Sequence, residues 1–243
     1  MPSITPRLSK YNLITSNPQT QTCLYAKWTP IENITYKILM VFVDEIHATL
    51  ETTEGESIEV NYKMSAIEKQ ICHLIPYQVS KYLNEWFDGA VNFQVDTYFT
   101  TVPLGRESFS CGTNSSDKSC YYIFANKISE ITGILDNYRS VIITFGMNDY
   151  DSLLRGAAGV ATNKYAAVHL ESLLKSFFIN NVPLETLLDI FYQDWESIAI
   201  LYLHEFTHTV EMCFFDEHGL TVYEFHEFIK YYIDQGLVIK SLK

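Results

Sequence analysis

Residues 194–215 read DWESIAILYLHEFTHTVEMCFF and contain neither Gly nor Pro, which predicts one uninterrupted helix. Asp194 is a suitable N-cap, and Glu196 lies where the helix dipole favours a negative charge. Residues 198–203 are apolar on every side, so we expect this helix to be buried over most of its surface. The rest of the chain must therefore supply apolar elements that cover it.

Upstream, strand and helix patterns interleave, and helices gather towards the C-terminus. We expect strands at residues 36–52 (one long strand), 58–64, 90–101 and 140–147, and an edge strand or hairpin within 156–174. We expect helices at 65–87, kinked or split at Pro76, at 126–138, and almost continuously from 184 to the end. Ser65 and Glu68 have capping-box spacing. The order predicts an α+β fold with a mixed sheet, as one domain over 36–243 after an N-terminal arm over 1–35.

The composition is that of an ordinary globular protein, with 243 residues of which 47% are hydrophobic. A formal net charge of −12 argues against nucleic acid or an anionic membrane as the main partner, and at most favours neutral or basic substrates. No eighteen consecutive residues are apolar, so no spanning helix is expected. The polar start lacks the apolar core of a secretory signal, which leaves localisation open, including secretion after removal of a leader. We expect a monomer.

Five cysteines without a CxxC pair argue against a disulfide framework or a cysteine-based zinc ribbon. Cys111 and Cys120 bracket a polar loop, and they are either a disulfide or two free thiols. Cys72 and Cys213 lie in apolar helical patterns and are expected in the core.

The central helix carries His204, Glu205 and His208. Residues four apart lie one turn above each other on the same helix face, so both imidazoles can reach one metal ion. Glu205 lies beside them and can contact a water molecule held there without binding the metal itself. Two imidazoles and a carboxylate in an apolar setting are costly unless something pairs them, and a zinc ion would do so.

A helix that reads HEFTH resembles the active-site helix of the zincin metallopeptidases, in which the Glu is the general base. The resemblance implies a mixed sheet packed on helices and one catalytic Zn²⁺ ion. Metzincins continue as HExxHxxGxxH, but Glu211 and Phe214 stand at the Gly and final His positions here. Gluzincins take a third ligand, a Glu, from the following helix about eighteen or nineteen residues after the second His.

Several downstream side chains could complete the site: Glu211, Asp216, Glu217, His218, Glu224, His226 and Glu227. Glu211 lies seven residues after His204 on the same helix, about 10 Å along the axis. His204, His208 and Glu211 therefore cannot all bind one metal ion in tetrahedral geometry. Residues 216–219, DEHG, are typical of a turn between two helices.

Thr221 and Glu224 have capping-box spacing, which gives Glu224 a local role. Eighteen residues separate His208 from Glu227, the HExxH-x18-E spacing of gluzincins, so we select Glu227 as the third ligand. Glu224, His226, Asp216 and Glu217 remain alternatives. Tyr231, one turn beyond Glu227, is the candidate donor to the oxyanion.

These residues predict a zinc metallopeptidase, an endopeptidase acting on peptides or proteins, with Glu205 as general base. Two alternatives remain: a zinc hydrolase of a non-peptide substrate, and a non-catalytic binding or surface domain stabilised by zinc. The edge strand that pairs with substrate in zincins is expected within residues 164–174. His47, His73 and His169 have no partner at metal-binding spacing and are expected to be structural.

Overall fold

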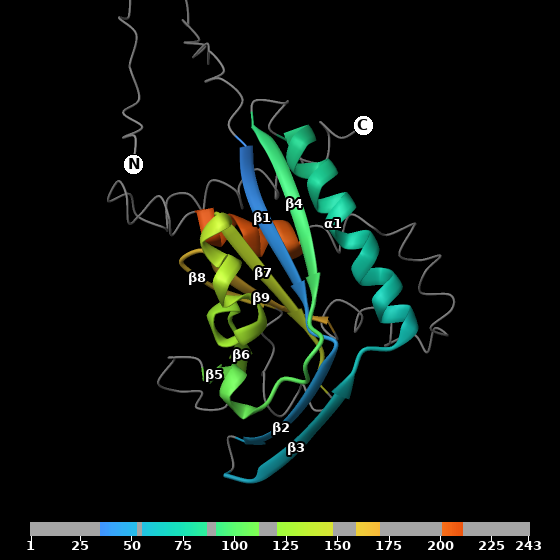
Figure 1. Ribbon diagram of the computed structural model, residues 1–243, viewed down its shortest axis with the longest axis vertical. Coiled ribbons are helices and arrows are strands. Elements are labelled where there is room, and N and C mark those ends of the chain that lie inside the picture. Colours follow the sequence, from blue (N-terminus) through green and yellow to red (C-terminus); the bar gives the residue numbers. More distant parts are fainter. Residues whose placement is uncertain are drawn as a thin grey trace, which may run out of the picture. The chain divides into compact units, whose positions relative to one another are not determined.

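A computed structural model describes residues 35–52, 55–86, 91–111, 121–147, 159–170 and 201–210. The chain divides into two compact units, Met1–Ile31 and Glu32–Lys243, and every described residue belongs to the second. This unit is a mixed α/β structure built on a mostly parallel sheet (Figure 1), which is compatible with the predicted α+β class. Within the described part of the chain, no helix is long and apolar enough to cross a membrane.

Among the described residues the central sheet has five strands, of which only the last is antiparallel to its neighbour. In spatial order they are β4 (Asn92–Phe99), β1 (Thr35–Phe42), β7 (Ser140–Phe145), β9 (Tyr165–His169) and β8 (Gly159–Thr162). Every residue of β7 is buried, as expected for the apolar run SVIITF between two parallel neighbours. β8 and β9 form the predicted hairpin, and Asn163 in its turn has φ of 50°.

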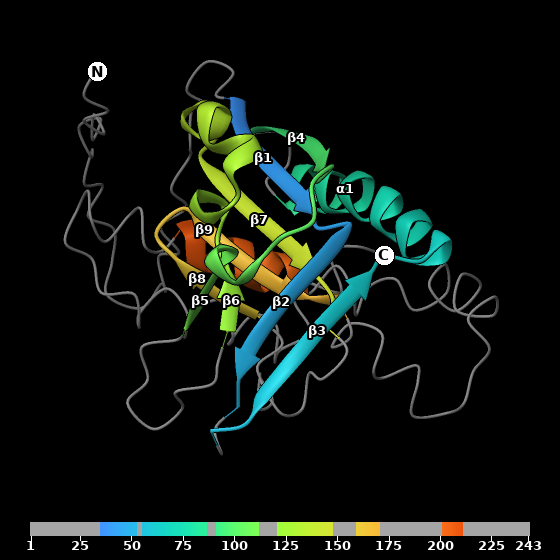
Figure 2. The same ribbon diagram turned by 60° about the horizontal axis from the view of Figure 1, so that its bottom comes forward.

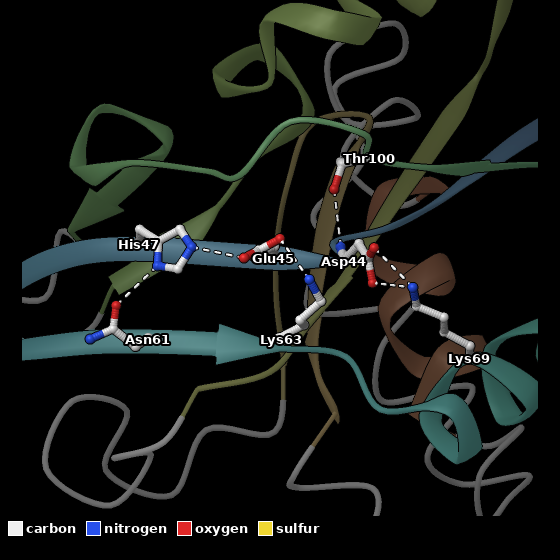
Figure 3. A network of polar contacts seen from close by, with 7 residues as sticks. All are labelled: Asp44, Glu45, His47, Asn61, Lys63, Lys69 and Thr100. Atoms are coloured by element: carbon white, nitrogen blue, oxygen red, sulfur yellow. Dashed lines mark hydrogen bonds and ion pairs between the residues drawn. The ribbon is translucent and has the colours of Figure 1, made fainter.

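The long strand predicted over 36–52 is two strands, because the chain leaves the central sheet after Phe42. β2 (Glu45–Glu51) then pairs with β3 (Ser57–Lys63) as a separate antiparallel hairpin (Figure 2). Contacts of Asp44 fix this break between β1 and β2 (Figure 3). Its backbone N–H donates to Thr100 Oγ1 at 3.0 Å, and its carboxylate contacts Lys69 Nζ at 2.7 Å. β1 therefore ends close to the acidic pair Asp44 and Glu45, which interrupts the apolar run, and contacts of Asp44 fix the position of the break.

Helix α1 (Ala66–Trp86) begins with the predicted capping box. The Glu68 backbone N–H donates to Ser65 Oγ at 3.2 Å, and the Ser65 N–H donates to Glu68 Oε2 at 2.6 Å. The helix is not split at Pro76. Its buried stripe continues on both sides of the proline, at Ile71, Cys72, Ile75, Val79 and Leu83. Packing of this stripe against the sheet keeps both halves in one helix despite the missing N–H.

The helix predicted over 126–138 consists of two 3-10 segments, η2 (Ala125–Lys127) and η3 (Ser129–Asn137). Ile131 and Leu135 are the buried residues of η3, four apart, so the apolar period was read correctly but the helix type was wrong. Further segments are η1 (Arg106–Ser108) and the small hairpin of β5 (Phe109–Cys111) with β6 (Tyr121–Ile123). Cys120 lies outside the described residues, so its pairing with Cys111 stays a prediction.

The two faces of the central sheet carry different elements. Residues that are partners in the register share a face, so Phe42, Phe99 and Thr144 lie on one side. α1 covers this side, where His73 stacks at 4.6 Å from the Phe99 ring. The opposite side faces η2 and β5, where Phe145 meets Phe109 edge-on (Figures 1 and 2). The candidate site belongs to the α1 side.

Candidate metal centre

The HExxH sequence lies on a helical segment at 201–210, the motif helix, which is drawn in orange behind the sheet in Figure 1. The helix predicted over 194–215 is confirmed for these residues, and the remainder lies outside the described parts. Tyr202, Phe206 and Thr209, spaced as one face of a helix, turn towards the sheet. The Phe206 ring meets the rings of Tyr36 and Phe93 edge-on, with centroids 5.6 and 6.0 Å away.

A chain of hydroxyl groups fixes the C-terminal end of the motif helix to the sheet. Thr209 Oγ1 donates to the Phe206 carbonyl at 2.7 Å, which uses its single proton. Ser140 Oγ, 2.7 Å from Thr209 Oγ1, must therefore donate to it, and Tyr36 Oη, 2.8 Å away, must donate to Ser140. Each buried hydroxyl is thus satisfied, and the rotation of the helix about its axis is defined.

Tyr202, one turn before Phe206, makes a second polar contact between the motif helix and the sheet. Its Oη lies 2.8 Å from Thr144 Oγ1 on β7, and its side chain is fully buried. Burial raises the pKa of Tyr202 well above its usual value, so the phenol stays neutral. With this face held on the sheet, the histidines are carried on another face of the helix.

His204 and His208 bring their Nε2 atoms to 3.0 Å from each other, with their rings perpendicular. Two nitrogens that bind one zinc ion at about 2.0–2.1 Å in tetrahedral geometry lie roughly 3.3 Å apart. The observed separation is within a few tenths of an ångström of that value. The pair also suits a hydrogen bond between two neutral rings, so it is satisfied without a metal. Its geometry fits two ligands of one ion.

Glu205 is buried beside the histidine pair, with 3% of its surface exposed. Its Oε1 lies 4.0 Å from His204 Nε2, and Oε2 has no hydrogen-bond partner among the described residues. Burial raises the pKa of Glu205 to about 7. A cation held by the neighbouring imidazoles would lower that pKa again, because it favours the charged form.

Gly159, the first residue of β8, lies against the Glu205 side chain. A Cβ atom on Gly159 would be 2.5 Å from Glu205 Oε1 and 2.6 Å from its Cδ. The carboxylate therefore occupies the space that any other residue at 159 would need. The antiparallel end strand of the described sheet and the Glu of the motif are in direct contact.

No protein family, curated protein or solved structure matches this chain significantly. The interpretation of the centre accordingly rests on the geometry of its own residues.

The remaining predicted site residues are not placed. The selected third ligand Glu227, the alternatives Glu224, His226, Asp216 and Glu217, and the candidate oxyanion donor Tyr231 all lie beyond residue 210, outside the described parts. Across the parts that are described, no three His, Cys, Asp or Glu side chains gather as a metal site would require. The two histidines and Glu205 are thus the part of the predicted centre that can be located.

The other described histidines lie away from the centre. His47 hydrogen-bonds Asn61 and Glu45 on the β2–β3 hairpin (Figure 3), and these contacts raise its pKa. His73 stacks on Phe99 from α1. His169 meets the Phe145 ring edge-on, at 5.0 Å, on the sheet side opposite the motif helix. These positions agree with the expected structural roles.

The substrate-pairing edge strand expected within residues 164–174 is not an edge. β9 (Tyr165–His169) is the described strand of that range, and it is hydrogen-bonded to β7 on one side and β8 on the other. β8 ends the strand order instead, and the side of it away from β9 has no strand partner among the described residues. The sequence pattern identified the hairpin but not which of its strands lies outermost.

Proposed function

We propose that this chain is a zinc-dependent metallopeptidase of zincin-like fold, in which His204 and His208 bind the metal and Glu205 is the general base. The observation that carries the proposal is the 3.0 Å approach of the two Nε2 atoms beside a buried carboxylate on one rigid helix. Glu227 is proposed as the third protein ligand and Tyr231 as the oxyanion donor, on the spacing of the sequence alone.

The arrangement of the sheet supports this proposal. The motif helix packs against the α1 side of the parallel strands, and the antiparallel strand β8 lies next to Glu205. A strand edge that has no strand partner among the described residues and lies beside a general base can align an extended peptide by backbone hydrogen bonds, which would bring its carbonyl carbon near that base. A peptide or protein substrate is therefore favoured over a compact small molecule.

Zinc bound at the two histidines would supply Lewis-acid activation of a water molecule. Glu205 would serve as the general base, accepting a proton from the attacking water and delivering it to the departing amine. The apolar packing of the helix excludes bulk water from the carboxylate's inner side.

The test compares wild type with Glu205→Gln, which keeps the size of the side chain and removes its basicity. Zinc content and cleavage of a mixed peptide library, read by mass spectrometry, are measured on the same preparations. We expect equal zinc and a loss of cleavage of about 10²–10⁴-fold, which is the usual contribution of general base catalysis. Glu59→Gln, on the exposed face of β3, should cleave like wild type.

Equal cleavage by wild type and Glu205→Gln would contradict the proposed mechanism. Zinc binding without cleavage of any peptide by wild type would favour one of the alternatives, a non-peptide hydrolase or a zinc-stabilised binding domain.

A further inference from the structure

Position 159 holds a glycine because of the limited space beside it, and not because of its backbone conformation. Among the described glycines only Gly55 has a positive φ, so the backbone at 159 is open to any residue. A Cβ there would lie 2.5, 2.6 and 2.8 Å from Oε1, Cδ and Cγ of Glu205. Since Cγ is involved as well as Oε1 and Cδ, rotation of the carboxylate alone would not relieve the overlap.

Packing is also what orients the carboxylate of Glu205 within the described structure. Its Oε2 is buried there without a hydrogen bond, and Oε1 is 4.0 Å from His204 Nε2. The backbone of Gly159 supplies the wall on the β8 side. A displacement of the carboxylate by even 1 Å would misplace it relative to the histidine pair.

We propose that Gly159 is a positioning residue for the general base: its missing side chain sets where the Glu205 carboxylate rests against β8. This inference rests on the proposed function for its catalytic consequence. It links the base directly to the strand along which a substrate backbone would lie, so that base and substrate are placed by the same element.

The first test is Gly159→Ala in the zinc-loaded protein, with Gly133→Ala as the matched control. An added Cβ at Gly133 would have no atom within 4 Å. We expect Gly159→Ala to lower kcat by about 10–100-fold with KM within about twofold and zinc content unchanged, because only the base has moved. Gly133→Ala should behave as wild type. Wild-type kcat in a folded Gly159→Ala protein would overturn the proposal.

The second test does not depend on activity and uses a thermal double-mutant cycle. Gly159→Ala should lower Tm by about 3–8 °C when Glu205 is present, as overpacking does in a chain of this size. In a Glu205→Ala background, which lacks Cγ, Cδ and Oε1, the same change should shift Tm by less than about 1 °C. An equal shift in both backgrounds would overturn the proposed contact.

Shortening the side chain at position 205 should offset the effect of an added Cβ at position 159. In Gly159→Ala the added change Glu205→Asp withdraws the carboxylate by one methylene and should restore folding if the single variant is unstable. The double variant should be at least as active as Glu205→Asp alone. If wild type cleaves no peptide, the proposed function fails, while the thermal cycle still decides whether Gly159 positions the Glu205 side chain.

Discussion

The hydroxyl of Tyr202 lies 2.8 Å from Thr144 Oγ1, which joins the motif helix to the most central strand of the described sheet. This bond comes two residues before His204. Together with the Tyr36–Ser140–Thr209 hydroxyl chain it holds the helix from both ends of the motif. The positions of His204 and His208 therefore depend on polar contacts on the opposite side of the helix.

Tyr202→Phe should lower the free energy of unfolding by about 1–3 kcal/mol, because it leaves the Thr144 hydroxyl buried without this partner. Urea denaturation measures the effect. Tyr77→Phe is the control, since Tyr77 is 68% exposed and should change stability by less than about 0.5 kcal/mol. Equal losses in the two variants would show that the Tyr202–Thr144 bond adds no stability.

Gly146→Ala should destabilise the attachment of the β2–β3 hairpin to the end of β7. A Cβ at Gly146 would lie 2.4 Å from carbon atoms of the Tyr62 ring, and that ring also donates from its hydroxyl to Glu68 Oε1 at 3.2 Å. The ring must move, at a cost of about 1–3 kcal/mol in the free energy of unfolding. This predicted loss of stability would be contradicted if chemical denaturation showed Gly146→Ala to be as stable as Gly133→Ala.

Glu130 should make the fold less stable in acid. Burial acts to raise its pKa, but hydrogen bonds from Thr101, Val102 and Tyr98 outweigh this and lower it below the usual 4.5. A carboxylate with a lowered folded pKa contributes stability that is present above about pH 4.5 and is lost as the pH falls through the folded pKa.

The comparison for this effect is wild type against Glu130→Gln, unfolded by urea between pH 3 and pH 7. We expect the difference in free energy of unfolding to be largest at neutral pH and to shrink below about pH 4.5. A difference in the free energy of unfolding that stays constant between pH 3 and pH 7 would contradict a lowered pKa of Glu130 in the folded protein.

Glu227→Gln should weaken zinc binding far more than Glu224→Gln does. Loss of a direct ligand should exceed the roughly 10–100-fold loss of affinity that accompanies loss of a neighbouring support residue. Competition with a zinc-binding dye measures both affinities. Wild-type affinity in Glu227→Gln with weakened binding in Glu224→Gln would reassign the third ligand.

Local chemistry made several elements predictable from the sequence. The capping box of α1 depends on two residues three apart, and the His204–His208 approach depends on helix geometry alone. The all-apolar β7 run likewise identified a buried strand.

Tertiary contacts decided what the sequence could not show. Strand β1 ends just before Asp44, and the sequence pattern does not reveal that Asp44 contacts Thr100 and Lys69, which lie far along the chain. Gly159 and Glu205 are 46 positions apart in the chain, and a glycine after two alanines gives no signal of a packed carboxylate. Which strand of the β8–β9 hairpin is outermost depends on pairing with β7.

The measurement that tests the metal centre most directly is the zinc content of the purified protein, by inductively coupled plasma mass spectrometry after dialysis against a weak chelator. We expect about one zinc ion per chain in wild type and in His73→Ala, whose ring stacks on Phe99 away from the centre. His204→Ala and His208→Ala should each retain less than about a tenth of that zinc, because two ligands do not hold the ion against the chelator. A zinc-free wild type after loading, or full zinc in both histidine variants, would contradict the account.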